Sequence, residues 1–188
     1  ICIDGIDILN ISLRSLRKLI STVPQDSFLF NDTINNNITF GKTNATKEEV
    51  VEACKKANAD EFIDKLPDKY DTIIGERGVQ LSGGQRQRLA IARTFYKDPE
   101  IFIFDDCLSA IDATKEQIIL RHLKKASKNK SSIIISHRIS TIKDVDQIIV
   151  LENGKITEIG NHDELLANKL FYFQMNQIQD KTNKEDII

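Results

Sequence analysis

The segment from Leu81 to Asp106 reads LSGGQRQRLAIARTFYKDPEIFIFDD, and it decides the fold of the 188-residue chain. Ser82 can cap a helix that opens on two glycines and runs to about residue 96, where an Asp-Pro pair follows. The continuous apolar run at 101–104 predicts a strand buried on both faces, as parallel strands are, and two acids end it. The segment therefore indicates a helix beside a buried parallel strand.

The sequence further along the chain repeats the pattern of a buried strand. The apolar run Ile133–Ile135 predicts a second parallel strand, and a helix is expected between the two strands over about 113–126. A β-hairpin is predicted around residues 152–154, an Asn-Gly signal that separates two apolar stretches. Helices are expected at 163–166 and 170–178.

The sequence before the opening segment mixes short strands with helices. Strands are expected within 1–8 and 21–25, around a helix with apolar spacing over 12–20. Thr46-x-x-Glu49 is a capping box, which opens a further helix. The polar, glycine-bearing stretch at 68–79 is expected to be loop.

Together these elements predict an α/β fold with a parallel sheet core and an inserted helical subdomain. The predicted domain covers residues 1–179, with the α/β core at 1–25 and 98–165, the helical subdomain at 26–97, the C-terminal helix at 166–179 and a charged, frayed tail at 180–188. The sequence contains neither an internal repeat nor a low-complexity linker.

The composition excludes several classes of protein. Lys and Arg total 26 against 28 Asp and Glu, a net charge of −2, so no nucleic-acid partner is expected. Three cysteines without C-x-x-C spacing indicate reduced thiols rather than a disulfide or zinc framework. No apolar run approaches the roughly 18 residues that span a bilayer. The chain begins with Ile1 and its only methionine is Met175, so we expect it to be cut at its N-terminus.

The Gly-Gly turn at the start of the predicted helix suits a phosphate group. A helix N-terminus offers unpaired N–H groups and a partial positive charge, and Gly83 and Gly84 allow close approach to the backbone. Ser82 adds a hydroxyl, and Gln85 follows the turn directly. The alternative for a bare Ser-Gly-Gly is a plain helix start.

Polar residues at the ends of the predicted parallel strands suit a metal ion and a reacting water. Asp105 ends its strand where Mg²⁺ would find an oxygen ligand, and Asp106 would face the attacking water. His137 ends the next strand and can hydrogen-bond a phosphate oxygen or orient that water. Gln25 can bind Mg²⁺ or water through its amide. Taken singly, these residues have structural alternatives: a helix cap, a packed histidine and a surface glutamine.

A phosphate-binding P-loop, Gly-x-x-x-x-Gly-Lys-Ser/Thr, does not occur in the sequence. The tripeptide at 41–43, Gly-Lys-Thr, copies only the end of that motif, because Asn36 stands where the first glycine belongs. We expect this tripeptide to form a turn.

The combination of motifs resembles the nucleotide-binding domain of ABC transporters of the exporter type. The matching motifs are the Q-loop Val23–Gln25, the pre-signature segment Gly75–Gly78, the signature Leu81–Gln85, Walker B Ile101–Asp105, the D-loop Ser109–Asp112 and the switch His137. The resemblance runs from about residue 4 to residue 177 and implies a RecA-like P-loop NTPase fold that lacks its Walker A segment.

The resemblance also implies roles for individual residues, with ATP and Mg²⁺ as the bound groups. The implied catalytic residues are Asp106 and His137, the nucleotide-binding residues are Gln25, Ser82, Gly83, Gly84, Gln85 and Asp112, and the metal ligands are Asp105 and Gln25. In this family each ATP site joins the Walker motifs of one domain to the signature of a second domain.

One implied catalytic position departs from the family. The family has a glutamate after the Walker B aspartate, and here that residue is Asp106, whose side chain is one methylene shorter. A shift of about 1 Å at a reacting group can slow a reaction roughly 100-fold. The resemblance therefore implies the degenerate half of a heterodimer, whose intact signature completes the partner's competent site.

The implied partners are a second nucleotide-binding domain and a transmembrane domain, contacted through 26–80, in a transporter whose ATP-hydrolysing part lies at the cytoplasmic face of the membrane. Without Walker A, the chain alone is expected not to hydrolyse ATP. Two alternatives remain open: a truncated fragment without function, and a soluble DNA-maintenance ATPase. The short spacing between signature and Walker B and the absence of heptad repeats argue against the second alternative.

Overall fold

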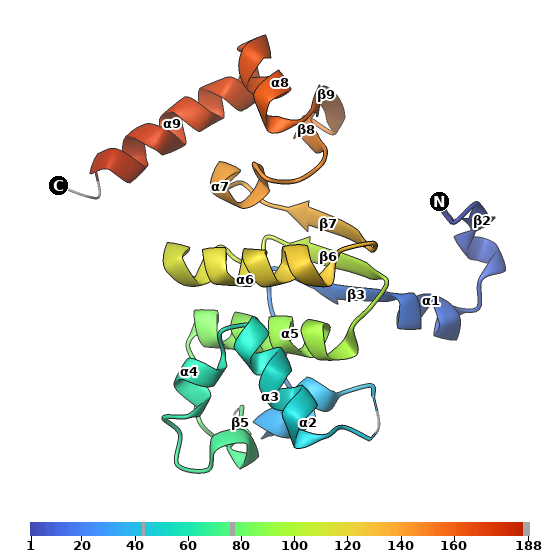
Figure 1. Cartoon of the computed structure of the whole chain (residues 1–188), viewed down its shortest axis with the longest axis vertical. Helices are drawn as coiled ribbons and strands as arrows, with labels where there is room; N and C mark the ends of the chain where they lie inside the picture. The colour runs from blue at the N-terminus through green and yellow to red at the C-terminus, as the bar shows by residue number, and fades with distance from the viewer. Residues whose placement is uncertain (43, 76–77, 186–188) are drawn as a thin grey trace. The chain divides into compact units, whose positions relative to one another are not determined.

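The computed structural model describes residues 1–42, 44–75 and 78–185. The chain divides into two compact units, Ile1–Ile135 and Ser136–Ile188, and each unit contains its own cluster of buried apolar side chains (Figure 1).

The first unit is built on a parallel sheet. Strands β3 (Ile20–Val23), β6 (Ile101–Asp105) and β7 (Ser131–Ile135) lie in the order β3-β6-β7, with β6 in the centre. Phe102 and Phe104 of β6 are fully buried, as predicted. This arrangement confirms the predicted parallel strands.

The expectation that the second strand is buried on both faces is wrong. Ile133 and Ile135 are 52% and 51% exposed. The reason is that β7 lies at the edge of the sheet, paired only with β6 among the described strands, and four of its five residues are exposed.

Helix α5 (Gly83–Lys97) is the centre of the first unit. It contacts β3 and the helices α2 (Ile34–Thr39) and α3 (Lys47–Lys56), and Figure 1 shows it running beside the sheet. Asp98 ends α5 in the left-handed conformation, directly before Pro99, as the Asp-Pro pair predicted. Helix α6 (Ala113–Ala126), which connects β6 to β7, has the predicted bounds, and Asp112 caps it.

The first unit also contains several smaller elements, and those within 1–8 and 12–20 are the short strands and the helix that were predicted there. These elements are β1 (Cys2–Ile3), β2 (Ile6–Asp7), the 3₁₀ turn η1 (Ile8–Asn10), α1 (Leu13–Leu19), β4 (Asp32–Thr33), α4 (Asp60–Ile63), the 3₁₀ turn η2 (Lys69–Asp71) and β5 (Ile73–Ile74). The stretch expected to be loop over 68–79 contains η2 and β5, because β5 pairs with β4 across a distance that no local pattern reveals.

The first two residues of the tripeptide that copies the end of a P-loop, Gly41 and Lys42, follow α2 and its turn. Gly41 has φ +86°, and the Lys42 N–H donates to the carbonyl of Thr39 at 3.0 Å. The Lys42 ammonium lies over the Tyr96 ring at the end of α5. Thr43 lies outside the described residues.

The second unit consists of α7 (Ile139–Ile142), the hairpin strands β8 (Ile148–Glu152) and β9 (Lys155–Gly160), α8 (His162–Asn168) and α9 (Phe171–Glu185). Its core contains Ile139, Ile148, Leu165 and Tyr172. Residues 180–185, which lie in the predicted tail, continue α9, because no glycine or proline stops the helix there.

The cysteines are free, as predicted, and burial raises the pKa of Cys54 and of Cys107 to about 12. Across the part of the chain that the structure describes, every helix is too short or too polar to cross a bilayer.

Candidate functional site

The Gly-Gly turn is a capping box at the start of α5. The Ser82 hydroxyl accepts from the Gln85 N–H at 3.3 Å, and the Gln85 side chain accepts from the Ser82 N–H at 2.8 Å. This exchange fixes the turn from both ends. The N–H groups of Gly83 and Gly84 lie in the first turn, where a helix has no acceptor of its own to offer them. They are therefore available to an anion in front of the helix.

A pocket of about 450 Å³ opens at this turn. It is lined by Ser82, Gly83, Gly84 and Arg88 of the signature helix and its cap, and by Ala110, Ile111, Asp112 and Lys115 from the turn before α6 and from α6 itself. Backbone amides, a hydroxyl and two cationic side chains of this lining are groups that a phosphate can bind, and the Asp112 carboxylate lies beside them.

The turn before α6 packs against the signature turn by direct backbone contact. A Cβ added to Gly84 would lie 2.8 Å from the Ala110 carbonyl oxygen, closer than real Cβ contacts come. A Cβ at Gly83 would meet only the Ala110 methyl at 4.0 Å, an ordinary contact. Gly84 is therefore required by the packing of this chain, before any ligand is considered.

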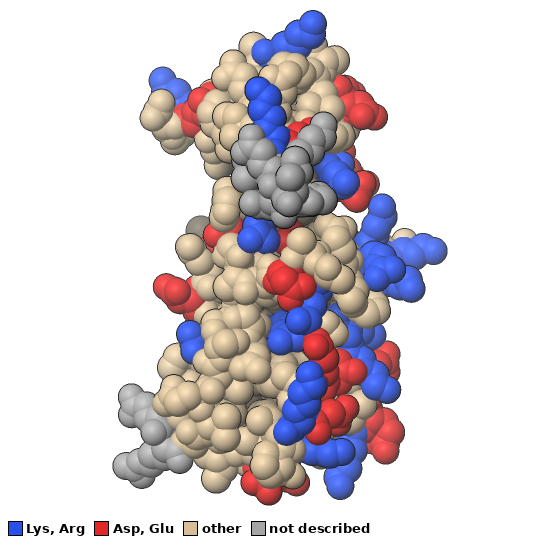
Figure 2. Space-filling view, turned by 90° about the vertical axis from the view of Figure 1, so that its left-hand side faces the viewer, with Lys and Arg blue, Asp and Glu red and all other residues tan. Residues whose placement is uncertain are grey.

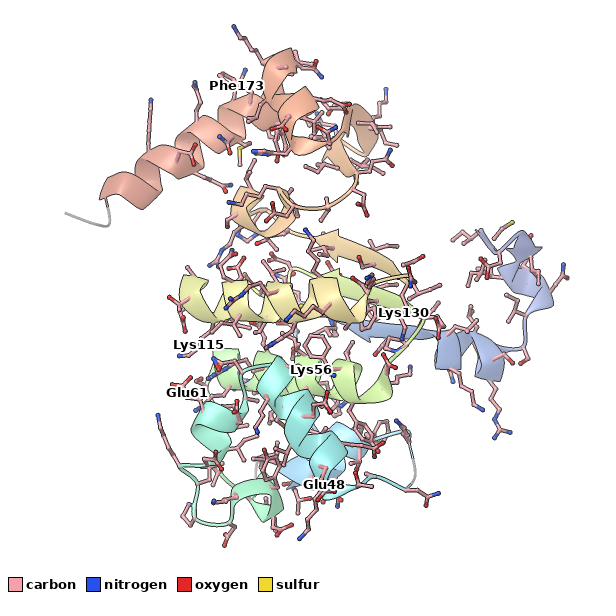
Figure 3. The ribbon with its side chains drawn as sticks, viewed as in Figure 1. Glu48, Lys56, Glu61, Lys115, Lys130 and Phe173 are labelled. Carbon is pink, nitrogen blue, oxygen red and sulfur yellow. The ribbon has the colours of Figure 1, made fainter. Side chains whose placement is uncertain are left out.

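Ion pairs join the pocket to the helical part of the first unit. The Lys115 ammonium lies 3.0 Å from the Asp112 carboxylate and 3.6 Å from that of Glu61 on α4, and Figure 3 shows Glu61 and Lys115 approaching from their two helices. The Arg88 guanidinium lies 3.6 Å from Glu61 and donates to the Asn58 carbonyl. A hydrogen bond from the Lys115 N–H, which caps α6, lowers the pKa of Asp112.

The residues predicted to hold the metal and the water lie at the carboxyl ends of β3 and β6. Val23 pairs with Phe104, so Asp105, the last residue of β6, and Gln25, two residues after β3, come at the same end of neighbouring parallel strands. An amide and a carboxylate oxygen there suit Mg²⁺, which keeps several waters. The described residues contain no group of three His, Cys, Asp or Glu side chains that would bind a metal more fully.

Asp106 is held by its backbone. Its N–H donates to the Ile135 carbonyl at 2.9 Å, and its carbonyl accepts from the Ser109 hydroxyl at 2.9 Å. Its φ of +43° lies in the left-handed region, which Asp tolerates better than most residues. The position of this acid is thus tied both to the end of β7 and to the turn before α6.

His137 lies in the second unit, just after the sheet ends, and its side chain is exposed. Its carbonyl accepts from the Gln179 side-chain amide at 2.7 Å. The structure therefore brings together the signature turn and Asp112, and it places Gln25, Asp105 and Asp106 at the carboxyl ends of β3 and β6. Of the pre-signature segment, Glu76 and Arg77 lie outside the described residues.

Sequence reasoning missed several residues that support these sites. Arg88, Lys115 and Glu61 form the ion pairs at the pocket, and the buried Gln87 donates to the Gln25 carbonyl at 3.4 Å. Lys115 had a local signal, because it stands three residues after the cap of a predicted helix. The others make contacts across 27 to 62 residues, which no local pattern reveals.

The fold and the pocket define an α/β domain with the N-terminus of α5 at a pocket. The family model described as "ABC transporter" matches residues 1–109, and the chain belongs to the ABC transporter family, with the predicted α/β P-loop NTPase fold. A solved structure of a bacterial Atm1-family ABC exporter with ATP bound superposes with a TM-score of 0.90 at 46% identity, over 95% of this chain and 32% of that one.

Similar curated proteins include a multidrug resistance protein and a flippase. "Multidrug resistance protein pgp-1" of Caenorhabditis elegans is 47% identical over 99% of this chain, and "ATP-dependent lipid A-core flippase" of Legionella pneumophila (strain Paris) is 48% identical over 100% of it. The chain spans 14% and 32% of the lengths of these two relatives.

Proposed function

We propose that the chain belongs to the ATP-hydrolysing part of an export transporter. The observation that carries the proposal is the pocket in which the signature turn, two cationic side chains and the cap of α6 converge. The relatives named as an exporter, a multidrug resistance protein and a flippase support transport over DNA maintenance. ATP is the expected substrate, and Mg²⁺ is the expected metal cofactor.

The proposed roles follow the positions of the side chains. Asp105 and Gln25 would hold Mg²⁺ at the carboxyl ends of β6 and β3, where the metal would neutralise phosphate charge. Asp106 would orient the attacking water, and His137 would hydrogen-bond a phosphate oxygen. The turn at 82–85 and Asp112 would meet the nucleotide held by a second nucleotide-binding domain.

The second domain is proposed to be a different chain. Asp106 supports this view, because its shorter carboxylate would hold the attacking water less well than the family's glutamate. The signature turn of this chain is intact, which supports the proposal that it completes a competent ATP site on the partner. A heterodimer with one slow and one fast site follows.

A transmembrane domain is the second proposed partner, contacted through 26–80. Phe28, Phe40 and Ile73 of this stretch expose 66%, 59% and 54% of their surface, as a docking surface for an apolar helix would. Figure 2 shows charged side chains of both signs in the lower part of its view, beside a broad uncharged area. The nucleotide-binding domain formed by this chain would then lie at the cytoplasmic face of the membrane.

ATP hydrolysis by the purified full-length transporter and its partner tests the proposal. We expect Mg²⁺-dependent turnover from that complex and none from the 188-residue chain, which has no P-loop to hold the β- and γ-phosphates. A full-length complex without ATPase activity would overturn the proposal. Turnover by the short chain above a heat-treated control would overturn the role given to the missing motif.

A further inference from the structure

One side chain of the C-terminal helix holds the backbone on both sides of Arg138. The Gln179 Nε2 donates to the His137 carbonyl at 2.7 Å, and its Oε1 accepts from the Ile139 N–H at 2.9 Å. Both halves of the amide are used, and the two bonds bridge 42 and 40 residues of sequence. A side-chain amide carries its donor and its acceptor on separate atoms, so one glutamine can make both bonds at once.

The bond to Ile139 supplies a missing helix cap. Ile139 is the first residue of α7, and the cap position, Arg138, makes no side-chain hydrogen bond to the helix. The early N–H groups of a helix need an acceptor from outside the helix. Gln179 provides that acceptor from α9, and it thereby fixes where the loop carrying His137 enters α7.

Helix α9 is anchored so that Gln179 can act at a fixed point. Tyr172, two turns earlier on the same face, is buried; its N–H donates to Glu158 at 2.9 Å and its hydroxyl pairs with His162 at 2.8 Å. Met175 lies between Tyr172 and Gln179 and packs on the core of the second unit. The side chain of Gln179 is thus placed by buried contacts, not by a flexible surface helix.

We propose that Gln179 is a positioning residue for His137, acting through the backbone of the His137 loop. The proposal rests on the proposed function, in which His137 contacts a nucleotide phosphate. Truncation of the amide would release the loop while leaving the imidazole itself unchanged. Since displacement of a reacting group by about 1 Å can cost roughly 100-fold in rate, even partial release of the loop should be measurable.

Three variants of the full-length transporter separate the two bonds. Gln179→Ala removes both. Gln179→Glu keeps an acceptor for the Ile139 N–H but replaces the donor to the His137 carbonyl with a carboxylate oxygen. Gln177→Ala, on the exposed face of the same helix, is the matched control.

Hydrogen exchange followed by mass spectrometry is the first measurement, on peptides that cover 136–142. We expect Gln179→Ala to speed exchange there by about tenfold, as expected when a backbone hydrogen bond opens locally. Gln179→Glu should stay near wild type at Ile139, and Gln177→Ala should not differ from wild type. Unchanged exchange in Gln179→Ala, or equal acceleration in the control, would overturn the proposal.

Single-turnover hydrolysis at this chain's own site, with the partner's site inactivated, is the second measurement. Gln179→Ala and Gln179→Glu should both slow the step by about tenfold at unchanged half-saturation by ATP, because both lose the bond to His137. Faster exchange without slower hydrolysis would reduce Gln179 to a cap of α7 and overturn its positioning role. The exchange result stands even if the wild-type transporter shows no ATPase activity, which would count against the proposed function instead.

Discussion

The signature turn and the His137 loop are held in opposite ways. At the signature turn, the backbone of Gly84 packs against the backbone of Ala110, and a single added carbon would collide with a carbonyl oxygen. The His137 loop is held by one side chain, Gln179, that reaches it from 42 residues further along the chain. Backbone packing leaves no room for graded change, whereas a side-chain contact can be weakened one bond at a time.

The largest effect is expected from Gly84→Ala. Overpacking against a carbonyl costs about 1–3 kcal/mol, and the signature turn and Ala110 must separate to relieve it. We expect a lower midpoint of thermal unfolding in the 188-residue chain and loss of most ATPase activity in the full-length complex. Calorimetry and steady-state hydrolysis measure the two effects.

Gly83→Ala is the control for this packing. Its Cβ has room, and alanine is favoured over glycine in a helix by up to about 1 kcal/mol, so stability should be unchanged or higher. Equal destabilisation by both substitutions would mean that the close approach to Ala110 does not distinguish the two glycines.

A smaller effect on activity is expected from Asp106→Glu. Asp106, like the signature turn, is held in place through its backbone. The longer carboxylate should raise single-turnover hydrolysis at this chain's own site by about tenfold, measured with the partner's site inactivated. The left-handed backbone should make the glutamate about 1 kcal/mol less stable than Asp. An unchanged rate would show that the length of this carboxylate is not what limits the site.

The smallest effect on stability is expected from substitutions of Asp112, whose side chain caps α6 beside the signature turn. Asp112→Ala removes the cap of α6 and should cost about 1 kcal/mol, whereas Asp112→Asn keeps a cap and should cost little. The folded pKa is lowered, so the carboxylate stabilises the fold above its unfolded pKa and loses that contribution as the pH falls through the folded value. Unfolding midpoints at neutral and acidic pH should show the gap between wild type and Asp112→Ala narrowing in acid.

Local signals explain which parts of the fold the sequence predicted. The cap at Ser82, the Asp-Pro stop and the apolar run of β6 are written in neighbouring residues, and α6 has the predicted bounds. The exposure of β7 was missed, because an apolar run does not say whether a strand lies at an edge. The pairing of β5 with β4 was missed because the two strands are about 40 residues apart in the sequence.

In the candidate site, too, the residues marked by local motifs were predicted and the long-range contacts were not. The motifs indicated Ser82, Gly84 and Asp112, and the structure places all three at one pocket. The contacts that hold the motifs were not predictable, because Gln87 and Gln179 are ordinary glutamines in sequence and gain their roles from partners at least 40 residues away. The roles in catalysis stay predictions.

The central claim is that this chain completes a competent site with its signature turn while its own acid serves a slow one. Ser82→Asp and Asp106→Asn test the claim directly, in the full-length transporter with its partner. Aspartate keeps the helix cap but puts a negative charge where a phosphate should bind, and Ser82→Asn, a neutral cap, is its control. Ser82→Asp avoids the collision with Ala110 that any side chain at Gly84 would cause.

The measurement is steady-state ATP hydrolysis by the three variant complexes. We expect Ser82→Asp to lower the rate of ATP hydrolysis at least about tenfold, since removal of favourable electrostatics at a reacting phosphate typically costs this much or more. Asp106→Asn should keep most of the activity, and Ser82→Asn should lose less than Ser82→Asp. If Asp106→Asn proves more damaging than Ser82→Asp, this chain carries the principal catalytic carboxylate and the central claim is contradicted.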